Sequence, residues 1–475
     1  MCYKVAVESA SPNPRNEKLL VGTLALLALV WRFLYIGHES LWIDEAASVG
    51  IVRLPWIDFF KVLWRREGNM TLYYLLLRPW VFFGSSEAWI RAVSAVFSAG
   101  TVPFVYLIGR ELRDRRTGLI ASLLFALSPF AVEYAQEARG YSLACLLVTA
   151  GSWFLLRGLK SSDVRAWKWW GVSMVLAVYA HFFAALVLLV HLLYSAKNLP
   201  KHRALLGKMA LALMPIAAFI TLKRLGQLNW VPPLSWSGLT SAFSELAGGA
   251  DLALVLLPMA ALAAIIYWGK QANTLFLWMW LLVPVGLILL GSFAQPMLAP
   301  RFLIICLPPF LLLAATALVS LPRSLVLAIL AVILFFSVRT QFLNWKTDTK
   351  DDWRSATSYV LDNSKPSDGI LFHQALGRQA FTYYEGREKA NNAPMVITPA
   401  RGDRMTYRDF EAEMEDRVAA KLEQAPSRLW IVLNRNTPRG TPDEYTRFLL
   451  GLVERRYDCR PQEFRGIEVF SCTVK

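Results

Sequence analysis

The sequence has few charged residues and few cysteines. Only 18% of its 475 residues are Asp, Glu, Lys or Arg, whereas soluble domains carry about 25%. With a mean hydropathy of +0.39, this deficit points away from a soluble protein and toward membrane spans. The five cysteines form no CxxC or Cys/His pattern with metal-ligand spacing, and no GxxxxGK[ST] loop is present to hold a nucleotide. The chain also shows no repeat of fixed period and no low-complexity segment.

What the chain has in abundance is apolar runs, several of them about 20 residues long and so able to cross a bilayer. We predict spanning helices at 19–37, 88–109, 118–135, 141–157, 168–181, 182–196, 209–222, 251–268, 274–293, 301–320 and 323–338. The stretch 168–196 is too long for one helix and short for two, and His181 lies at its midpoint. The sequence therefore predicts an all-α polytopic membrane domain of about 11 transmembrane helices.

The run at 71–83 has a different character. It is only 13 residues long and contains Arg78-Pro79, so we predict a juxtamembrane or re-entrant helix. With residues 1–18 in the cytoplasm and 71–83 not crossing, the basic loops 110–117, 158–167 and 197–208 all become cytoplasmic, as the positive-inside rule requires. The net charge of +15 thus serves as a topology signal, and we expect no nucleic-acid partner.

The C-terminal part, residues 345–475, turns polar and mixed in charge. The segment WRSATSYVLD has helical spacing, and GILFH, PMVIT, RLWIVLN and GIEVFSC have the apolar character of short buried strands. We predict a small soluble α/β domain on the extracytoplasmic side, following a membrane domain at 19–344 whose first outer loop is 38–87. In an oxidising compartment Cys459 and Cys472 are able to pair.

Two adjacent acids, Asp44 and Glu45, follow the first apolar run within ESLWIDEAASV. Trp42, Ile43 and Trp56 suit a segment that lies in the membrane interface, where aromatic residues are favoured. A carboxylate shielded there from water suits a general base, so Asp44 and Glu45 are candidate catalytic residues. The alternative is an exposed pair that ends the first helix among the lipid headgroups.

A second polar segment, SPFAVEYAQEARGYSL at 128–143, interrupts two apolar runs. Arg139 offers planar paired donors for a phosphate, and Glu137 is placed to hold it. We therefore treat Glu137, Arg139 and the nearby Tyr141 as candidate substrate-binding residues. The alternative is an interhelical turn with an internal ion pair.

Four further residues are charged or titratable and lie in or beside apolar runs: Arg78, Arg91, His181 and Arg301. Such residues are costly in a membrane and are substrate-binding candidates for that reason. The arginines have an alternative, because their long side chains are able to reach the headgroups. A lone histidine at a helix junction is more often hydrogen-bonded structurally than catalytic.

These motifs carry a resemblance. The segment LWIDEA, followed by the stretch from GNMTLYYLLLRPW to EYAQEARGYSL, resembles the family 39 glycosyltransferases of the GT-C superfamily, which use polyprenyl-phosphate sugars. This group includes protein O-mannosyltransferases and aminoarabinose transferases of lipid A. The similarity covers residues 20–200, with weaker matches at APRFLIICLPPFLLLAA and DDWRSATSYV. One departure is Asn69-Met70-Thr71, where many members have His-Pro-Pro.

The resemblance implies an integral membrane glycosyltransferase of the inner or plasma membrane. It would move a sugar from a polyprenyl-phosphate donor to a hydroxyl acceptor on the outer face, with inversion. Membrane lipid would be a further partner. Asp44 matches the family's catalytic carboxylate and Glu45 its acidic neighbour, whereas Glu137 and Arg139 match the mouth of the donor cavity. The acceptor is left open between lipid, polysaccharide and protein. Some relatives use a divalent cation and others do not, so no cofactor is assigned and no metal ligand is named.

Two other classes of function remain open. A transporter or flippase for a lipid-linked sugar would also use intramembrane arginines and broken helices, although such proteins commonly contain internal repeats. The other class is a non-catalytic assembly protein with a tail that binds cell-wall material. Loss of transfer in an Asp44→Asn protein that still binds donor lipid would favour the enzyme.

Overall fold

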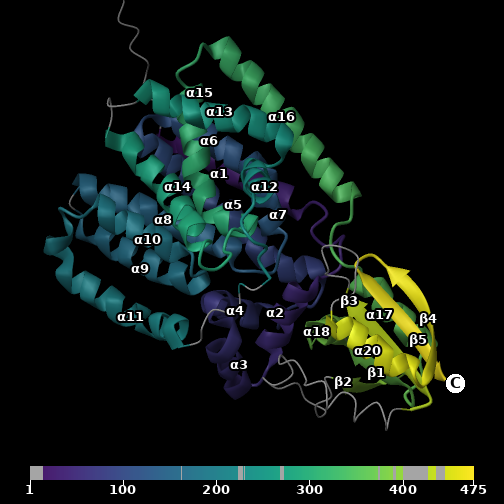
Figure 1. The fold of residues 1–475 in the computed structure, drawn as a ribbon. Coiled ribbons are helices and arrows are strands. Elements are labelled where there is room, and N and C mark those ends of the chain that lie inside the picture. Colours follow the sequence, from purple (N-terminus) through teal and green to yellow (C-terminus); the bar gives the residue numbers. More distant parts are fainter. Residues whose placement is uncertain are drawn as a thin grey trace, which may run out of the picture.

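The computed structural model of the protein describes residues 14–161, 163–222, 228, 230–267, 272–372, 375–388, 392–398, 426–434 and 444–475. The helices of the N-terminal domain are α1 (Pro14–Phe33), α2 (Ile43–Arg53), α3 (Trp56–Val62), α4 (Thr71–Trp80), α5 (Glu87–Leu112), α6 (Arg115–Leu127), α7 (Pro129–Ala135), α8 (Tyr141–Ser161), α9 (Val164–Ala180), α10 (Ala184–Tyr194), α11 (Arg203–Leu222), α12 (Trp236–Ala247), α13 (Ala250–Tyr267), α14 (Ala272–Gly291), α15 (Leu307–Leu318) and α16 (Arg323–Lys346). Short π or 3₁₀ segments occur at Leu63–Glu67, Gly68–Met70, Leu199–His202 and Pro300–Cys306. Figure 1 shows these helices packed together, with the C-terminal sheet beside them.

Among the described residues, six helices are long and apolar enough to cross a membrane. They begin at Glu87, Tyr141, Leu199, Thr274, Pro300 and Arg323. Two bent pairs, α6 with α7 and α12 with α13, raise this number to eight if each pair is one span. The protein is therefore a multi-pass membrane protein, whereas the expected number of about 11 spans stays a prediction.

The stretch 168–196 forms two helices that break at His181, which ends α9. The two helices lie antiparallel, because Trp170 on α9 donates its ring N–H to His191 Nδ1 on α10 at 3.0 Å. The other ring nitrogen of His191 lies 2.9 Å from Ser152 Oγ on α8. Both polar atoms of this buried ring are thus satisfied, which holds α8, α9 and α10 together.

Helix α4 lies within the run at 71–83. Its ten residues rise about 15 Å, half the hydrocarbon thickness of a bilayer. Buried Tyr73, Tyr74 and Leu77 form its inner face. Its position relative to the membrane, juxtamembrane or re-entrant, stays a prediction.

The bend between α6 and α7 is held by a buried arginine. Ser128 and Pro129 start α7, with the Ser128 hydroxyl accepting from the Ala131 N–H. Arg32, which has no exposed surface, donates to the carbonyl oxygens of Phe125 and Ala126 at the end of α6. These carbonyls lose their intrahelical partners at the break, so Arg32 caps them inside the membrane domain. The chain then turns by 56° into α7.

A sharper bend of 83° separates α12 from α13. Gly248 and Gly249 make it, with φ angles of 98° and 120°. A Cβ atom at Gly248 would also lie 2.7 Å from the Pro129 ring. Only glycine therefore fits where α12 meets the start of α7.

The C-terminal domain is a five-stranded sheet of order β2-β1-β3-β5-β4. Its elements are α17 (Trp353–Asn363), β1 (Gly369–Phe372), α18 (Ala375–Glu388), β2 (Met395–Thr398), β3 (Arg428–Asn434), α20 (Glu444–Glu454), β4 (Tyr457–Phe464) and β5 (Ile467–Val474). Strands β1, β2 and β3 are parallel, whereas β3, β5 and β4 pair antiparallel. The predicted helix and the four predicted strands are all confirmed, and β4 is an additional strand.

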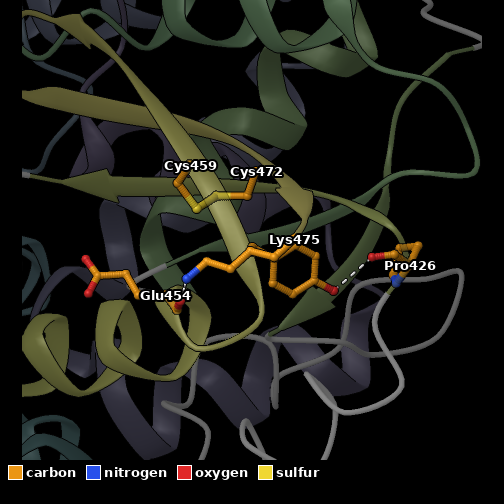
Figure 2. The surroundings of a disulfide bond; sticks show 6 residues. Pro426, Glu454, Cys459, Cys472 and Lys475 are labelled. Carbon is orange, nitrogen blue, oxygen red and sulfur yellow. Dashed lines mark hydrogen bonds between the residues drawn. A yellow bond between two sulfur atoms is a disulfide. The ribbon is translucent and has the colours of Figure 1, made fainter.

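The disulfide between Cys459 and Cys472 is present (Figure 2). It joins opposite positions of β4 and β5. Close by, the Tyr457 hydroxyl donates to the Pro426 carbonyl oxygen and Lys475 Nζ to that of Glu454. The disulfide thus fastens the edge strand β4 to β5, and Lys475 contacts the end of α20.

Polar contacts attach the C-terminal domain to the membrane domain. The buried carboxylate of Glu87, at the start of α5, accepts from Arg354 at 2.8 Å and also from Arg387. The Tyr383 hydroxyl donates to the Ser85 carbonyl oxygen at 2.6 Å. Helix α18 consequently lies against α2, the helix that begins beside Asp44 (Figure 1).

Candidate active site

Asp44 and Glu45 occupy the first turn of α2, where the helix dipole stabilises negative charge. Consecutive helical residues point about 100° apart, and the two carboxylates accordingly have different surroundings. The side chain of Asp44 is 25% exposed, and its Oδ2 atom lies 3.5 Å from Arg301 Nη1. Asp44 is thus an accessible carboxylate beside a fixed cation.

Glu45, by contrast, is fully enclosed. Its carboxylate accepts two hydrogen bonds from Arg91, at 2.8 and 2.6 Å, and one from the Ala138 N–H at 2.9 Å. Lys350 Nζ lies 3.2 Å from the same group. Burial alone would raise the pKa of Glu45, but the charges of Arg91 and Lys350 outweigh it and hold the pKa at about 2. Glu45 is therefore ionised in the folded protein.

Arg91 joins the segment between α1 and α2 to α5. Besides Glu45, it donates to the carbonyl oxygens of Ile36, Glu39 and Ser40, each at 2.9 Å. Every nitrogen of its guanidinium thus has a partner, and the side chain is 2% exposed. The loop that leads into α2 is fixed by this network.

Arg139 lies in the turn between α7 and α8, next to α2 and α4. Its Nη1 atom donates to the Tyr74 hydroxyl at 3.0 Å and to Ser48 Oγ at 3.4 Å. Ser48 Oγ in turn donates to the Asp44 carbonyl oxygen at 2.9 Å, so Arg139 and Asp44 share a neighbour. The Nε atom of Arg139 has no hydrogen-bond partner among the described residues. One donor of this buried guanidinium thus lacks a partner, which is uncommon for a buried polar atom.

Arg301 is held between two aromatic rings. Its guanidinium carbon lies 5.2 Å from the Trp42 ring centroid and 4.6 Å from that of Trp230, which favours a fixed cation there. The next residue, Phe302, lies 5.4 Å from the His181 ring, and His181 lies 5.5 Å from Tyr141. These contacts place Tyr141 and His181 near Arg301, the residue that contacts Asp44.

Glu137 lies in the same turn as Arg139, but the two side chains form no ion pair in the part of the chain that the structure describes. Burial raises the pKa of Glu137, and the positive charges of Lys350 and Arg301 offset part of that effect. Its Oε2 atom has no hydrogen-bond partner among the described residues. The internal ion pair considered from the sequence is therefore replaced by two side chains that each have a free polar atom.

Arg78 is placed apart from this group. It donates to the carbonyl oxygens of Val52 and Leu54, both at 2.8 Å, at the end of α2. Its guanidinium also lies over the rings of Trp56 and Phe59, 3.9 and 5.1 Å from their centroids. Arg78 thus fastens α2 to α4.

A cavity of about 530 Å³ opens beside the group. Its wall includes Arg301 and Glu137, and also the bend at Gly248 and the segment 349–351 that leads into the C-terminal domain.

Two residues of the cavity wall were not predicted from the sequence. Lys350 was not predicted because nothing in its polar surroundings links it to a site some 300 residues earlier. Gln341 could have been predicted, because a polar residue within an apolar helix often indicates a functional site. Among the described residues, no group of three His, Cys, Asp or Glu side chains is arranged to hold a metal ion.

Comparisons with known proteins identify a family and several structures that this chain resembles. The sequence model of the dolichyl-phosphate-mannose-protein mannosyltransferase family matches residues 71–223. No curated protein matched the sequence.

Several solved structures share the fold. ArnT from Cupriavidus metallidurans, in the apo state, has a TM-score of 0.65 at 13% identity, over 96% of this chain and 98% of that chain. The same protein bound to undecaprenyl phosphate gives 0.57 at 12% identity, over 97% and 99%. The oligosaccharyltransferase AglB from Archaeoglobus fulgidus, in complex with an inhibitory peptide and a dolichol-phosphate, gives 0.51 at 12% identity, over 88% and 69%. Taken together with the family match, these likenesses indicate a membrane glycosyltransferase that resembles the protein O-mannosyltransferases and aminoarabinose transferases of the GT-C superfamily.

Proposed function

We propose that the protein transfers a sugar from a polyprenyl-phosphate donor to a hydroxyl acceptor, with inversion, on the extracytoplasmic face of the membrane. The observation that carries this proposal is the accessible carboxylate of Asp44, which lies 3.5 Å from Arg301. Arg139 lies close by, since its partner Ser48 donates to the backbone carbonyl oxygen of Asp44. A base and two cations at one place are what this reaction needs. The lipid phosphates bound by ArnT and AglB support the choice of donor.

In the proposed step, Asp44 takes the proton of the acceptor hydroxyl as its oxygen bonds to the anomeric carbon. The bond from that carbon to the phosphate oxygen breaks, and its electron pair leaves with the polyprenyl phosphate. Arg139, with an unpartnered Nε, and Arg301 stabilise the charge that develops on this phosphate. Attack from the side opposite the leaving group produces inversion.

The other predicted residues have supporting roles in this proposal. Glu45 and Arg91 position α2, because their side chains bind each other and the first outer loop. Arg78 does the same at the far end of α2. Glu137, Tyr141 and His181 border the site and contact substrate.

The orientation is part of the proposal. The disulfide between Cys459 and Cys472 supports an extracytoplasmic C-terminal domain, since disulfides persist in oxidising compartments. The C-terminal domain and the site share one face, because Lys350 contacts Glu45. The positive charge of the predicted cytoplasmic loops supports the same orientation.

The test is an in vitro transfer assay with a panel of polyprenyl-phosphate sugars, read by product mass. We expect product from at least one donor, and none from the Asp44→Asn protein. Movement of a lipid-linked sugar across a vesicle membrane without any transfer product would instead favour the transporter.

A further inference from the structure

We propose that the cavity of about 530 Å³ is the acceptor subsite and that it takes a neutral, hydroxyl-rich ligand, namely a glycan. This inference rests on the proposed transfer function and names the acceptor class for it. Of the possible acceptors, it favours a glycan over a phosphorylated lipid and over a peptide.

The cavity is built by segments that are far apart in the sequence. The segment 35–42 between α1 and α2, the helix α7, the bend between α12 and α13, the last turns of α16 and the segment 349–351 all contribute to its wall. Its volume lies within the range of about 300–1,000 Å³ that is typical of small-molecule sites. Such a space suits a few sugar rings better than an extended peptide.

Three buried polar atoms on the cavity wall have no hydrogen-bond partner among the described residues: Glu137 Oε2, Gln341 Oε1 and Trp42 Nε1. The side chain positions of Glu137 and Gln341 are 8% and 3% exposed. Buried polar atoms in native structures almost always have a partner, so these atoms indicate a ligand or ordered water. Two acceptors and one donor match hydroxyl groups, since each hydroxyl both donates and accepts.

The charge of the wall argues against a phosphorylated acceptor. Five carboxylates line the cavity, those of Glu39, Glu133, Glu137, Glu245 and Asp351. The lining cations are Arg91, Lys350 and Arg301. Arg91 and Lys350 already contact the buried Glu45. The wall therefore offers many oxygen acceptors and few cations without a partner, which suits the hydrogen bonds of neutral hydroxyls better than those of a phosphate.

Aromatic rings complete the wall. Tyr35 and Trp345 are stacked, with centroids 4.8 Å apart and planes inclined by 19°, and both line the cavity together with Trp42. Flat apolar rings beside hydrogen-bonding groups suit a sugar, which has apolar C–H faces and a polar rim.

The position of the cavity fits an acceptor. Arg301 lines the cavity and also lies 3.5 Å from Asp44. Arg139 contacts Tyr74 and Ser48 and is not part of the cavity wall. Arg301 thus stands at the boundary between the cavity and the proposed phosphate site, with the Asp44 carboxylate beside it. An acceptor hydroxyl at this end of the cavity would lie next to the base.

The experiment measures ligand binding to the purified full-length protein by saturation-transfer NMR and calorimetry. The probes are a panel of neutral oligosaccharides of two to four sugars, the same sugars carrying a phosphate, and a Ser/Thr peptide of similar mass. The variant is Gln341→Met, which removes one unpartnered oxygen at similar volume. The matched control is Ser337→Ala, one turn earlier on α16, buried but not on the cavity wall. If Gln341→Met does not fold, Glu245→Gln tests the same wall.

We expect at least one neutral oligosaccharide to bind, its phosphorylated form to bind at least tenfold more weakly, and Gln341→Met to lose about tenfold in affinity while Ser337→Ala loses none. No binding by any neutral oligosaccharide, tighter binding by the phosphorylated form or the peptide, or full affinity in Gln341→Met would overturn the inference. Asp44-dependent release of polyprenyl phosphate with a peptide acceptor would overturn it while leaving the transfer function in place. Oligosaccharide binding without any release of polyprenyl phosphate would leave the glycan site but overturn its role as acceptor subsite.

Discussion

Glu45 and Lys350 are 305 residues apart in the chain, yet Lys350 Nζ lies 3.2 Å from the Glu45 carboxylate. The same ammonium donates to the Gln136 carbonyl oxygen at 3.2 Å. One side chain from the start of the C-terminal domain thus contacts both α2 and the turn that carries Glu137 and Arg139. The two domains form the candidate site together.

Asp44→Asn should reduce transfer by a factor of about 10²–10⁴, the usual contribution of general acid–base catalysis. Donor binding should stay close to wild type, because the amide keeps the shape of the carboxylate. The measurement is single-turnover transfer combined with a donor-binding assay. Asp58→Asn is the matched control, since Asp58 lies in α3 of the same loop and contacts Lys61 at 3.6 Å. Wild-type turnover in Asp44→Asn would remove Asp44 from the mechanism.

Arg139→Ala should weaken donor binding by about tenfold or more, because charge-assisted hydrogen bonds contribute about 1.5–3 kcal/mol. The KM for the acceptor should change little. Arg157→Ala, a substitution of an exposed arginine on α8, is the control for loss of one positive charge. The readout is donor affinity by equilibrium binding, and an unchanged affinity in Arg139→Ala contradicts the assigned phosphate contact.

Glu45 should stabilise the fold in a pH-dependent way. Its folded-state pKa is about 2, below the ordinary value of about 4.3. The contribution is therefore present above about pH 4.3 and is lost as the pH falls toward 2. Thermal melting of wild type and Glu45→Gln should differ most near neutral pH, and the two curves should approach each other on acidification. A difference in melting temperature that does not vary with pH would contradict the assigned ion pair.

Glu87→Gln should loosen the C-terminal domain, because Arg354 and Arg387 both lose their charged partner. We expect protease cleavage near the junction at 345–352 to become faster and the melting temperature to fall. Glu385→Gln is the matched control on α18, because its carboxylate interacts with Arg378 of the same helix. If the two variants resist protease equally, Glu87 does not hold the domains together.

Reduction of the Cys459–Cys472 disulfide should expose two additional thiols, measured by the mass added by a maleimide reagent to the denatured protein with and without prior reduction. A loop of about 15 residues closed by a disulfide stabilises a fold by about 3 kcal/mol in the chain-entropy model, so the Cys459→Ser, Cys472→Ser protein should melt at a lower temperature. Equal labelling with and without reductant would show that the cysteines do not pair in the cell.

The sequence was most informative where one physical effect dominates. Strands β1 and β3 are buried along almost their whole length, so continuous apolar runs predicted them. Strand β4 was missed because it is the edge of the sheet, and its sequence YDCRPQEF is mostly exposed and polar. Helix breaks were harder, since the bends after α6 and α12 lie inside or beside apolar stretches.

The site was predictable only in part. Polar residues near the ends of apolar runs identified Asp44, Arg139 and Arg301, which lie near one another in the structure. The sequence did not predict that Asp44 is accessible and Glu45 is buried, because this difference depends on which side of α2 faces α5. Lys350 could not be found, since contacts across 305 residues leave no local pattern.

The buried guanidinium of Arg32 has a practical consequence for anyone who redesigns this protein. Position 32 lies in an apolar segment and invites replacement by leucine in a library intended to improve expression. Such a change would leave the carbonyl oxygens of Phe125 and Ala126 without their donor, at the bend that sets the direction of α7. Libraries should therefore keep residue 32 fixed, together with Gln136, whose amide holds the Arg32 and Leu34 carbonyl oxygens.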